Sequence, residues 1–224
     1  MRIITDFDGP IMDLSDRYYH VYQLCLAKVK LPNQILNIFP KSKFWAYKQA
    51  LIPERQLGIE SGLTVEQAEV FKQLRDIHAH QIQYLPFDLV VPGSISALEK
   101  IQASGSELLV MTLRRTCELE PAFKQHDLAR FFLPHHRYCL PDDYVKHGDV
   151  QAKTQLMAKA LTELKPDPNT WMIGDTEADI IAAKTHHIKV IGVLSGIRDR
   201  DRLEQYQPDK IVSNLAEAVK FILE

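Results

Sequence analysis

The chain has 224 residues, of which 46% are hydrophobic and 25% are charged, and its formal net charge is −2 at pH 7. This composition is that of a globular protein, and it excludes a long disordered or low-complexity chain. The sequence contains no long basic run, so we expect neither nucleic acid nor an anionic membrane surface as a partner.

The cysteines and the amino terminus indicate the compartment. The three cysteines lie far apart, at positions 25, 117 and 139, which indicates neither a disulfide framework nor a zinc site. The amino terminus lacks the positively charged segment and the long apolar run of a signal peptide. No apolar run in the sequence is long enough to span a bilayer. We therefore expect a cytoplasmic protein without a signal peptide or a membrane span.

The chain begins with a short apolar segment, residues 1–5, which predicts a buried strand. From about residue 14 to residue 83, apolar residues recur at three- and four-residue intervals, which predicts helices and no strand. The predicted helices cover 16–30, 41–51 and 64–83. Thr64 and Gln67, three residues apart, predict a capping box at the start of the last of these helices.

From about residue 87 onward, predicted helices and strands alternate. The helices cover 93–104, 117–132, 150–164, 177–187 and 215–223, and the strands cover 107–111, 137–140, 170–174, 189–194 and 210–213. Alternation of this kind is typical of crossover units that build a parallel sheet. The first strand must join that sheet, because alone it could not bury both of its faces.

This order predicts an α/β fold with two domains. Residues 1–13 and 86–224 would form a core domain around a doubly wound parallel sheet, and residues 14–85 would form a helical domain inserted into it. Ligands of an open parallel sheet bind beyond the carboxyl ends of its strands. The polar residues that follow the predicted strands are therefore the first candidates for function.

Asp6 and Asp8 follow the first strand and precede Gly9 and Pro10. Two carboxylates this close in the chain repel each other. A fold accepts that cost where a cation lies between them, where the chemistry needs both, or where both lie in a solvated turn. Asp-Gly-Pro is common in turns, so these residues alone do not distinguish a site from a turn.

Three further polar residues follow other strands. Thr112 comes after the second predicted strand, Asp175 after the fourth, and Asp179 four residues later. Each has another interpretation: Thr112 as a helix N-cap, Asp175 as the cap of a loop, and Asp179 as a solvent-facing helix residue. If the strands are neighbours, all three converge with the first two aspartates on one crevice.

Four short features resemble, in order, the sequence motifs of the haloacid dehalogenase-like (HAD) hydrolases: DFDGP, LLVMT, Lys153 and GDTEAD. The resemblance covers essentially the whole chain. PGSISALEKIQASG and VIGVLSGI also resemble the phosphoglycolate-phosphatase-like branch, and the helical insertion resembles that family's cap of the first type. Lys146, Lys159 and Lys165 lie near Lys153, but Lys153 opens the helix before the fourth strand, as the family's lysine does.

The resemblance implies a Rossmann-like core and a phosphoric monoester hydrolase that acts on a small phosphorylated metabolite. Asp6 would be the nucleophile that forms an aspartyl-phosphate, and Asp8 would move protons to the leaving oxygen and from water. Lys153 would neutralise charge on the nucleophile and the phosphate. Thr112 and nearby backbone N–H groups would hold the phosphate oxygens. Phosphoryl transfer is catalysed mainly by such positioning and neutralisation.

The same resemblance implies Mg²⁺ as the cofactor. Asp6, the backbone carbonyl of Asp8 and the carboxylate of Asp175 would bind the ion. Asp179 would support the site from behind or through water. A hard divalent cation between these carboxylates would account for the two aspartates that open the chain.

Some residues depart from the family pattern. Pro10 stands where the family more often has Thr or Val, and Leu113 follows Thr112 where a small or amide residue is common. Arg114 and Arg115 then lie near the predicted crevice, either against an anionic substrate or at the solvated start of the next helix, which the sequence favours. Leu113 and Arg114 nevertheless belong, with Thr112 and Lys153, to the candidate substrate-binding residues.

Several functions remain open at the level of sequence. A dehalogenase needs neither a metal nor a second aspartate, so Asp8 and the GDTEAD carboxylates argue against it. A sugar phosphomutase would keep the same motifs, and a degenerate HAD-fold binding module would keep the fold. In the inserted domain Arg17, Trp45 and Lys48 are possible substrate contacts, although Trp45 fits the core of that domain better. The sequence predicts neither the substrate nor the oligomeric state.

Overall fold

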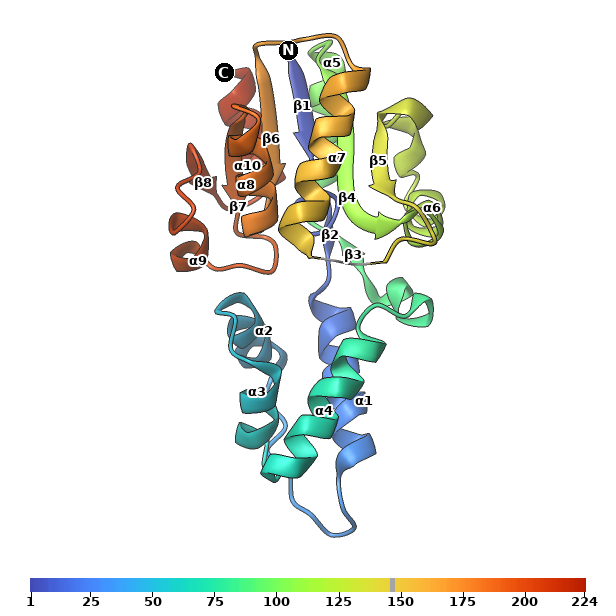
Figure 1. The fold of residues 1–224 in the computed structure, drawn as a ribbon, viewed down its shortest axis with the longest axis vertical. Helices are drawn as coiled ribbons and strands as arrows, with labels where there is room; N and C mark the ends of the chain where they lie inside the picture. The colour runs from blue at the N-terminus through green and yellow to red at the C-terminus, as the bar shows by residue number, and fades with distance from the viewer. Residues whose placement is uncertain (146–147) are drawn as a thin grey trace. The chain divides into compact units, whose positions relative to one another are not determined.

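The computed structural model of the protein describes residues 1–145 and 148–224, which divide into two compact units (Figure 1). The first unit contains residues 1–13 and 90–224, and the second contains residues 14–89. The chain passes between the units through two short strands, β2 (Met12–Asp13) and β3 (Leu89–Val90), which pair with each other. The predicted boundary after residue 85 falls inside a 3₁₀ helix, η1 (Ile82–Phe87).

A six-stranded sheet forms the centre of the first unit, in the order β5-β4-β1-β6-β7-β8. Its strands are β1 (Arg2–Thr5), β4 (Glu107–Arg115), β5 (Arg137–Leu140), β6 (Thr170–Gly174), β7 (Lys189–Val193) and β8 (Lys210–Val212). Every neighbouring pair is parallel, so the predicted α/β fold with a parallel sheet is confirmed. The first strand of the chain lies in the middle of the sheet, between β4 and β6.

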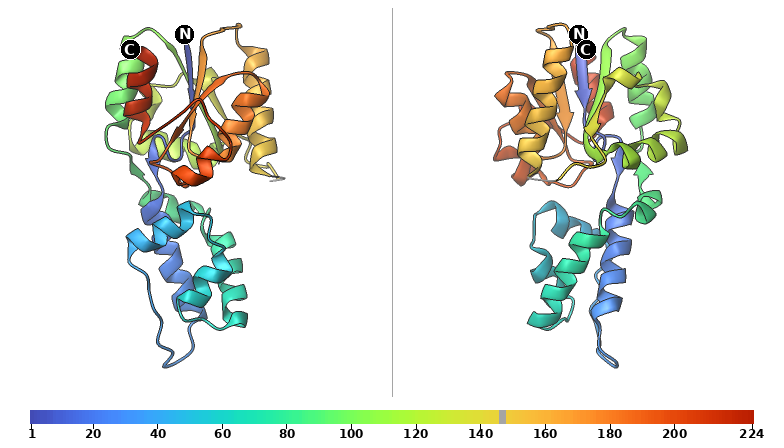
Figure 2. Two further views of the ribbon diagram at one scale, coloured as in Figure 1. Left: turned by 90° about the vertical axis from the view of Figure 1, so that its left-hand side faces the viewer. Right: turned by 45° about the vertical axis from the view of Figure 1, so that its right-hand side comes forward.

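Helices cover both faces of this sheet (Figure 2). They are α5 (Ser94–Ala103), α6 (Thr116–Gln125), α7 (Asp149–Glu163), α8 (Glu177–Thr185), α9 (Arg200–Glu204) and α10 (Leu215–Leu223), with the short 3₁₀ helices η2 (Leu128–Arg130) and η3 (Pro134–His136). On one face α7 and α8 contact each other, and on the other face α5 and α10 do so. The sheet is therefore doubly wound.

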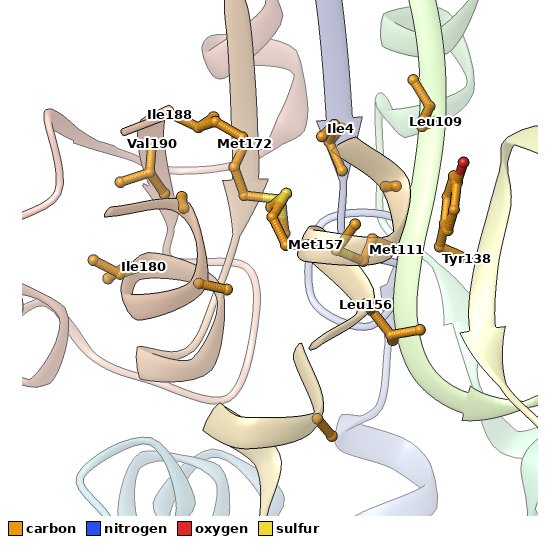
Figure 3. Packing of buried hydrophobic residues seen from close by; sticks show 14 of the residues in the cluster. Ile4, Leu109, Met111, Tyr138, Leu156, Met157, Met172, Ile180, Ile188 and Val190 are labelled. Carbon is orange, nitrogen blue, oxygen red and sulfur yellow. The ribbon is translucent and has the colours of Figure 1, made fainter. Parts of the chain in front are cut away.

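Apolar side chains on both faces of β1 build the core of the first unit. Ile3 and Ile4 are fully buried, and successive strand residues point to opposite faces. On the face of α7 and α8, Ile4 belongs to a cluster of buried side chains that includes Met111, Met157 and Met172 (Figure 3). This double burial explains why the two central residues of the first segment are both large and apolar.

Two short helices are missing from the sequence prediction. The helix α3 (Glu54–Glu60) and α9 are too short to show a clear helical period. The alternating charges of 197–202 predict only a solvated surface, yet α9 begins within them. Asp199 caps this helix, because its carboxylate accepts a hydrogen bond from the backbone N–H of Arg202 at 2.9 Å.

Two elements differ from the prediction in extent. The strand β4 continues past Met111 to Arg115. The helix α6 ends at Gln125, well before the predicted end at residue 132, because Asp127 adopts a left-handed conformation with φ of 52°. A residue in this conformation typically ends a helix.

In the second unit, residues 14–89, the remaining helices are α1 (Ser15–Val29), α2 (Lys41–Gln49) and α4 (Val65–His78). Tyr22 and Phe44 are fully buried there, and their rings stack with centroids 4.8 Å apart. The predicted capping box is present: the Thr64 hydroxyl accepts a hydrogen bond from the Gln67 N–H, and the Gln67 side chain accepts one from the Thr64 N–H. Across residues 1–145 and 148–224, every helix is too short or too polar to cross a membrane.

Two of the three residues that the sequence suggests as substrate contacts in the second unit form ion pairs within that unit. Arg17 is buried and lies 2.9 Å from the buried carboxylate of Asp88. Lys48 lies 2.5 Å from Glu54. Trp45 is only half-buried, so the prediction that it belongs to the core of this unit is wrong.

We expect Met157→Ala to lower the free energy of unfolding of the first unit by about 2–5 kcal/mol, because it leaves a cavity in the cluster of Figure 3. Gln155→Ala, at an exposed position of the same helix, should change that free energy by less than about 0.5 kcal/mol. The two tryptophans lie in different units, so in a Trp45→Phe background Trp171 fluorescence during urea denaturation follows the first unit. Equal midpoints for the two variants would contradict this packing.

Candidate active site

The carboxyl ends of three neighbouring strands meet at the candidate site. Thr5, the last residue of β1, is paired with Val110 of β4 on one side and with Ile173 of β6 on the other. Asp6 follows at once, and its backbone N–H donates to the carbonyl of Ile173 at 2.8 Å. This register brings the residues that follow β1 and β6 to the same level as the second half of β4.

Asp6 is a buried carboxylate that keeps a small accessible surface, with 7% of the residue exposed. Its Oδ1 accepts a hydrogen bond from the backbone N–H of Phe7 at 2.6 Å and lies 3.0 Å from Nζ of Lys153. These two contacts fix the orientation of the carboxylate at the end of the central strand. The remaining exposure leaves the group within reach of a small molecule.

Lys153 joins four elements of the core. Its Nζ lies 3.0 Å from Asp6 and 2.9 Å from the carboxylate of Asp179, and it donates a hydrogen bond to the carbonyl of Met111 at 2.8 Å. The side chain is 1% exposed. The ammonium group has therefore exchanged its hydration for three protein acceptors, two of them charged.

The helix α7 determines which lysine reaches the site. Lys153 lies on the buried face of α7, beside Ala152. Lys159 and Lys165 are exposed, and Lys146 lies outside the described residues. Of the three candidate lysines that the structure describes, Lys153 is the one placed beside Asp6, at the end of the first strand.

Asp179 supports the site from the first turn of α8, where it is fully buried. Its Oδ2 accepts hydrogen bonds from the N–H groups of Asp175 and Thr176, at 3.2 and 3.1 Å, and from the Thr176 hydroxyl at 2.8 Å. Its Oδ1 faces Lys153. Both oxygens are engaged by protein groups, so the interpretation of Asp179 as a solvent-facing residue is wrong.

Asp175 occupies space that two glycines leave open. The residue is 2% exposed, and its Oδ2 accepts a hydrogen bond from the backbone N–H of Ile197 at 2.7 Å. A Cβ atom at either Gly9 or Gly196 would overlap the Asp175 carboxyl group. Gly9 also has a φ of +90°, which residues with a side chain rarely adopt. The glycine after the aspartate pair is thus required by its backbone and by its neighbour.

A bulge in β4 forms another side of the site. β4 pairs regularly with β5 up to Met111, and the pairing resumes only at Arg115 after a shift in register. Residues 112–114 are the irregular part of the strand. Bulges are frequent next to functional sites, since the extra residues turn side chains in new directions.

Thr112 and Leu113 lie in this bulge. Thr112 is buried, and its hydroxyl accepts a hydrogen bond from the backbone N–H of Arg114 at 3.1 Å. Within the described part of the chain, the hydroxyl hydrogen itself has no acceptor. The next helix begins at Thr116, so Thr112 is not a helix N-cap. The Leu113 side chain is half-buried and packs against the cluster of Figure 3.

Arg114 is buried in the same bulge and binds Asp8. Its Nε lies 2.9 and 3.1 Å from the two carboxylate oxygens, and its Nη2 lies 2.6 Å from Oδ1. The guanidinium group also lies over the ring of Phe7, 4.9 Å from the centroid. The expectation that Arg114 starts a solvated helix is therefore wrong, and the exposed residue of the pair is Arg115.

The carboxylates carry more negative charge than the neighbouring cations offset. Burial raises the pKa of Asp6 well above its ordinary value, although the charge of Lys153 acts in the opposite direction. Burial also raises the pKa of Asp175 to about 8, and the nearby charge of Asp179 adds to this shift. Burial alone would lower the pKa of Lys153, but Asp179 and Asp6 raise it above its ordinary value. An additional cation would therefore be stabilised here.

The donor set fits a hard divalent cation. Asp6, Asp175 and Asp179 each offer a carboxylate oxygen, and these oxygens lie within 4.8 Å of one another. All of the offered ligands are oxygens, as Mg²⁺ prefers. The excess negative charge of the cluster favours the same ion. The structure thus provides a buried acidic group where the sequence predicts a metal.

The site residues fall within known sequence relationships. The family model described as HAD-hydrolase-like matches residues 151–218, which contain Lys153, Asp175 and Asp179. The chain is also 27% identical over 221 residues to "Probable phosphatase IndB" of Dickeya dadantii, and the alignment covers 97% of this chain and 91% of that protein. These matches agree with the resemblance of the chain to the haloacid dehalogenase-like hydrolases. The resemblance in the four sequence motifs, and the expectation of a hydrolase of this kind, are confirmed.

Solved structures share the fold of this chain. The crystal structure named "Putative Phosphatase from Clostridium difficile" matches with a TM-score of 0.73 at 20% identity, covering 99% of this chain and 97% of that one. A structure named "putative beta-phosphoglucomutase from Thermotoga maritima" matches with a TM-score of 0.63 at 18% identity, covering 100% and 99%. Both likenesses concern the fold, so the HAD fold by itself does not separate a phosphatase from a phosphomutase.

The loop after β7 contributes to the candidate site in a way that the sequence prediction missed. Gly196 and Ile197 hold the carboxylate of Asp175. Arg198 then pairs with Glu177 through two contacts of 2.7 and 2.8 Å, which fixes this loop to the start of α8. The signal was available in VIGVLSGI, because a glycine shortly after a parallel strand lies at the edge where ligands bind.

We expect Lys153→Ala to lower the free energy of unfolding by about 3–5 kcal/mol at pH 8 in chelator, because it leaves Asp6 and Asp179 buried without their cation. Lys159→Ala, at an exposed position of α7, should change it by less than about 0.5 kcal/mol. Chemical denaturation of both variants measures the difference.

The pH dependence of the loss gives a second check. A carboxyl group whose pKa is raised in the folded state, as for Asp6, destabilises the fold at high pH and less so as the pH falls. The loss in Lys153→Ala should therefore shrink between pH 8 and pH 5.5. A loss that stays constant over this range would show that Lys153 does not stabilise the fold through these carboxylates.

Proposed function

We propose that this HAD hydrolase is a Mg²⁺-dependent phosphatase that acts on a small phosphorylated metabolite through an aspartyl-phosphate on Asp6. One observation carries the proposal: Asp6 lies at the end of the central strand, oriented by Lys153 and grouped with Asp175 and Asp179. An anionic nucleophile of this kind can attack a phosphate dianion only where positive charge offsets both. The likeness to a protein named as a phosphatase supports the same activity.

In the first step, a carboxylate oxygen of Asp6 attacks phosphorus, and the bond between phosphorus and the leaving oxygen breaks. Asp8 donates a proton to the leaving oxygen. The hydroxyl of Thr112 donates its hydrogen to a phosphate oxygen, which suits a group whose hydrogen has no acceptor in the described structure. Lys153 keeps Asp6 in place and offsets part of the charge.

In the second step, water attacks the phosphorus of the aspartyl-phosphate. Asp8, now a carboxylate, takes a proton from that water. Inorganic phosphate leaves, and the carboxylate of Asp6 is restored. Asp8 is suited to both proton transfers, because its side chain is 26% exposed whereas that of Asp179 is fully buried.

Mg²⁺ would be held by Asp6, the backbone carbonyl of Asp8 and Asp175, with Asp179 in support. When bound, the ion neutralises charge on the nucleophile and on the phosphate. Asp179 would orient these ligands from behind. One of its carboxylate oxygens accepts a hydrogen bond from the Thr176 hydroxyl, and the other faces Lys153. Leu113 would contribute through the backbone of the bulge, since its side chain packs in the core.

The second unit would be the cap that selects the substrate, and the cytoplasm would be the compartment. A sugar phosphomutase is the second candidate, since a structural neighbour carries that name. It would return the phosphoryl group to the sugar and release no inorganic phosphate. A binding module without catalysis is disfavoured, because every residue type that the reaction needs is present at the site.

We expect chelation to abolish the release of inorganic phosphate and Mg²⁺ to restore it, because burial disfavours the ionised forms of Asp6 and Asp175 unless a cation offsets their charge. A panel of phosphorylated metabolites, assayed for inorganic phosphate with Mg²⁺ and with excess EDTA, measures this. Full turnover in EDTA would remove the metal from the proposal. Conversion of a sugar phosphate to its isomer without phosphate release would favour the phosphomutase.

We expect Asp8→Asn to accumulate a phosphorylated Asp6 when 4-nitrophenyl phosphate is the substrate. The nitrophenolate leaving group needs little acid assistance, so the first step proceeds. The second step lacks its general base, and general acid–base catalysis contributes roughly 10²–10⁴-fold to a rate. Rapid acid quench followed by peptide mass spectrometry identifies the phosphorylated residue.

Asp6→Asn is the matched control, because it removes the nucleophile and leaves Asp8 and its contact with Arg114 unchanged. It should show no label. A phosphoryl group on any other residue, or a labelled Asp6→Asn protein, would overturn the assignment of the nucleophile.

A further inference from the structure

The proposed reaction leaves one buried cation at the site without a role. Arg114 is 5% exposed, which is unusual for an arginine, and it lies within the bulge of β4. Its guanidinium group binds Asp8 through Nε and Nη2, at distances of 2.6 to 3.1 Å. Asp8 is the residue that must present its carboxyl group to the leaving oxygen.

Arg114 has contacts of its own besides those with Asp8. The Arg114 backbone N–H donates to Thr112, and its guanidinium group lies over the Phe7 ring. Asp8 lies in the turn after β1, and its side chain is 26% exposed. A two-pronged guanidinium contact restricts a carboxylate to one orientation. The bulge thus anchors the arginine, and the arginine orients the aspartate.

We propose that Arg114 is a positioning residue that orients Asp8 toward the leaving oxygen, and that it sets how well the enzyme accepts substrates with poor leaving groups. This inference rests on the proposed phosphatase activity. Alkoxide leaving groups need a well-placed acid, whereas nitrophenolate does not. Arg114 therefore changes how strongly the rate depends on the leaving group, through Asp8, and does not itself bind the phosphate.

Direct binding of phosphate is the other role open to an arginine at such a site. The contacts favour the positioning role, because two nitrogens of the guanidinium group already bind the carboxylate of Asp8. The two roles differ in what they do to kcat/KM, which covers the steps up to phosphoryl transfer to Asp6. Loss of a phosphate contact affects every phosphate ester, whereas loss of Asp8 orientation affects only esters that need the acid.

The experiment compares kcat/KM for propyl phosphate and for 4-nitrophenyl phosphate in Arg114→Gln, Asp8→Asn and the double variant. We expect Arg114→Gln to lower the value for propyl phosphate at least about tenfold, and that for 4-nitrophenyl phosphate less than about threefold. In the Asp8→Asn background, Arg114→Gln should change neither value, because the two residues act as a unit. Arg115→Gln, at the exposed neighbour, should leave both values unchanged.

Arg114→Lys covers the case in which Arg114→Gln does not fold, since it keeps the charge but not the two-pronged contact. It should change the ratio of the two kcat/KM values in the same direction by a smaller factor. Equal losses on both substrates, persisting in the Asp8→Asn background, would overturn the inference in favour of phosphate binding. An unchanged ratio in active variants would also overturn it. A wild-type protein that releases no phosphate from either ester would instead overturn the proposed phosphatase activity.

Discussion

The buried ammonium group of Lys153 is the interaction on which the rest of the site depends. A lysine without hydration is costly unless acceptors replace water, and here Asp6, Asp179 and the carbonyl of Met111 do so. These partners come from three different elements, so the lysine fastens α7 to β1, β4 and α8 at one point. This shared cation fixes the positions of Asp6 and of Asp179 in the fourth motif.

The same arrangement leaves a charge imbalance that suits phosphoryl transfer. Lys153 offsets part of the charge of Asp6 and Asp179, while Asp175 remains buried beside them with a raised pKa. A site with this surplus of carboxylates stabilises a bound cation. Close packing keeps the Asp175 carboxyl group in place, because a Cβ atom at Gly9 or Gly196 would overlap it.

Irregular backbone segments at the carboxyl edge of the sheet place several side chains and a backbone N–H group at the site. The bulge at residues 112–114 turns Thr112 and Arg114 into the site and Leu113 toward the core. The loop after β7 gives a backbone N–H to Asp175 and is fixed by the pair of Arg198 with Glu177. The chemistry therefore rests on a rigid sheet whose edge is shaped by a few irregular residues.

Much of this protein can be predicted from local sequence, because periodicity and order are local properties. The strands and the longer helices follow from the spacing of apolar residues, and Asp6, Lys153 and Asp175 follow from their places after or before those elements. Short helices such as α3 and α9 cannot be predicted in this way, because one or two helical turns are too short to show the spacing of apolar residues.

Only the tertiary structure decided which residues contact one another at the site. Arg114 has the local sequence of a solvated helix start, and only the shift in register between β4 and β5 buries it against Asp8. Likewise, the two residues that hold Asp175 in place, Gly196 and Ile197, come from a segment 21 and 22 positions later in the chain. Contacts of this range depend on strand order and backbone irregularity, which the spacing of residues along one segment does not encode.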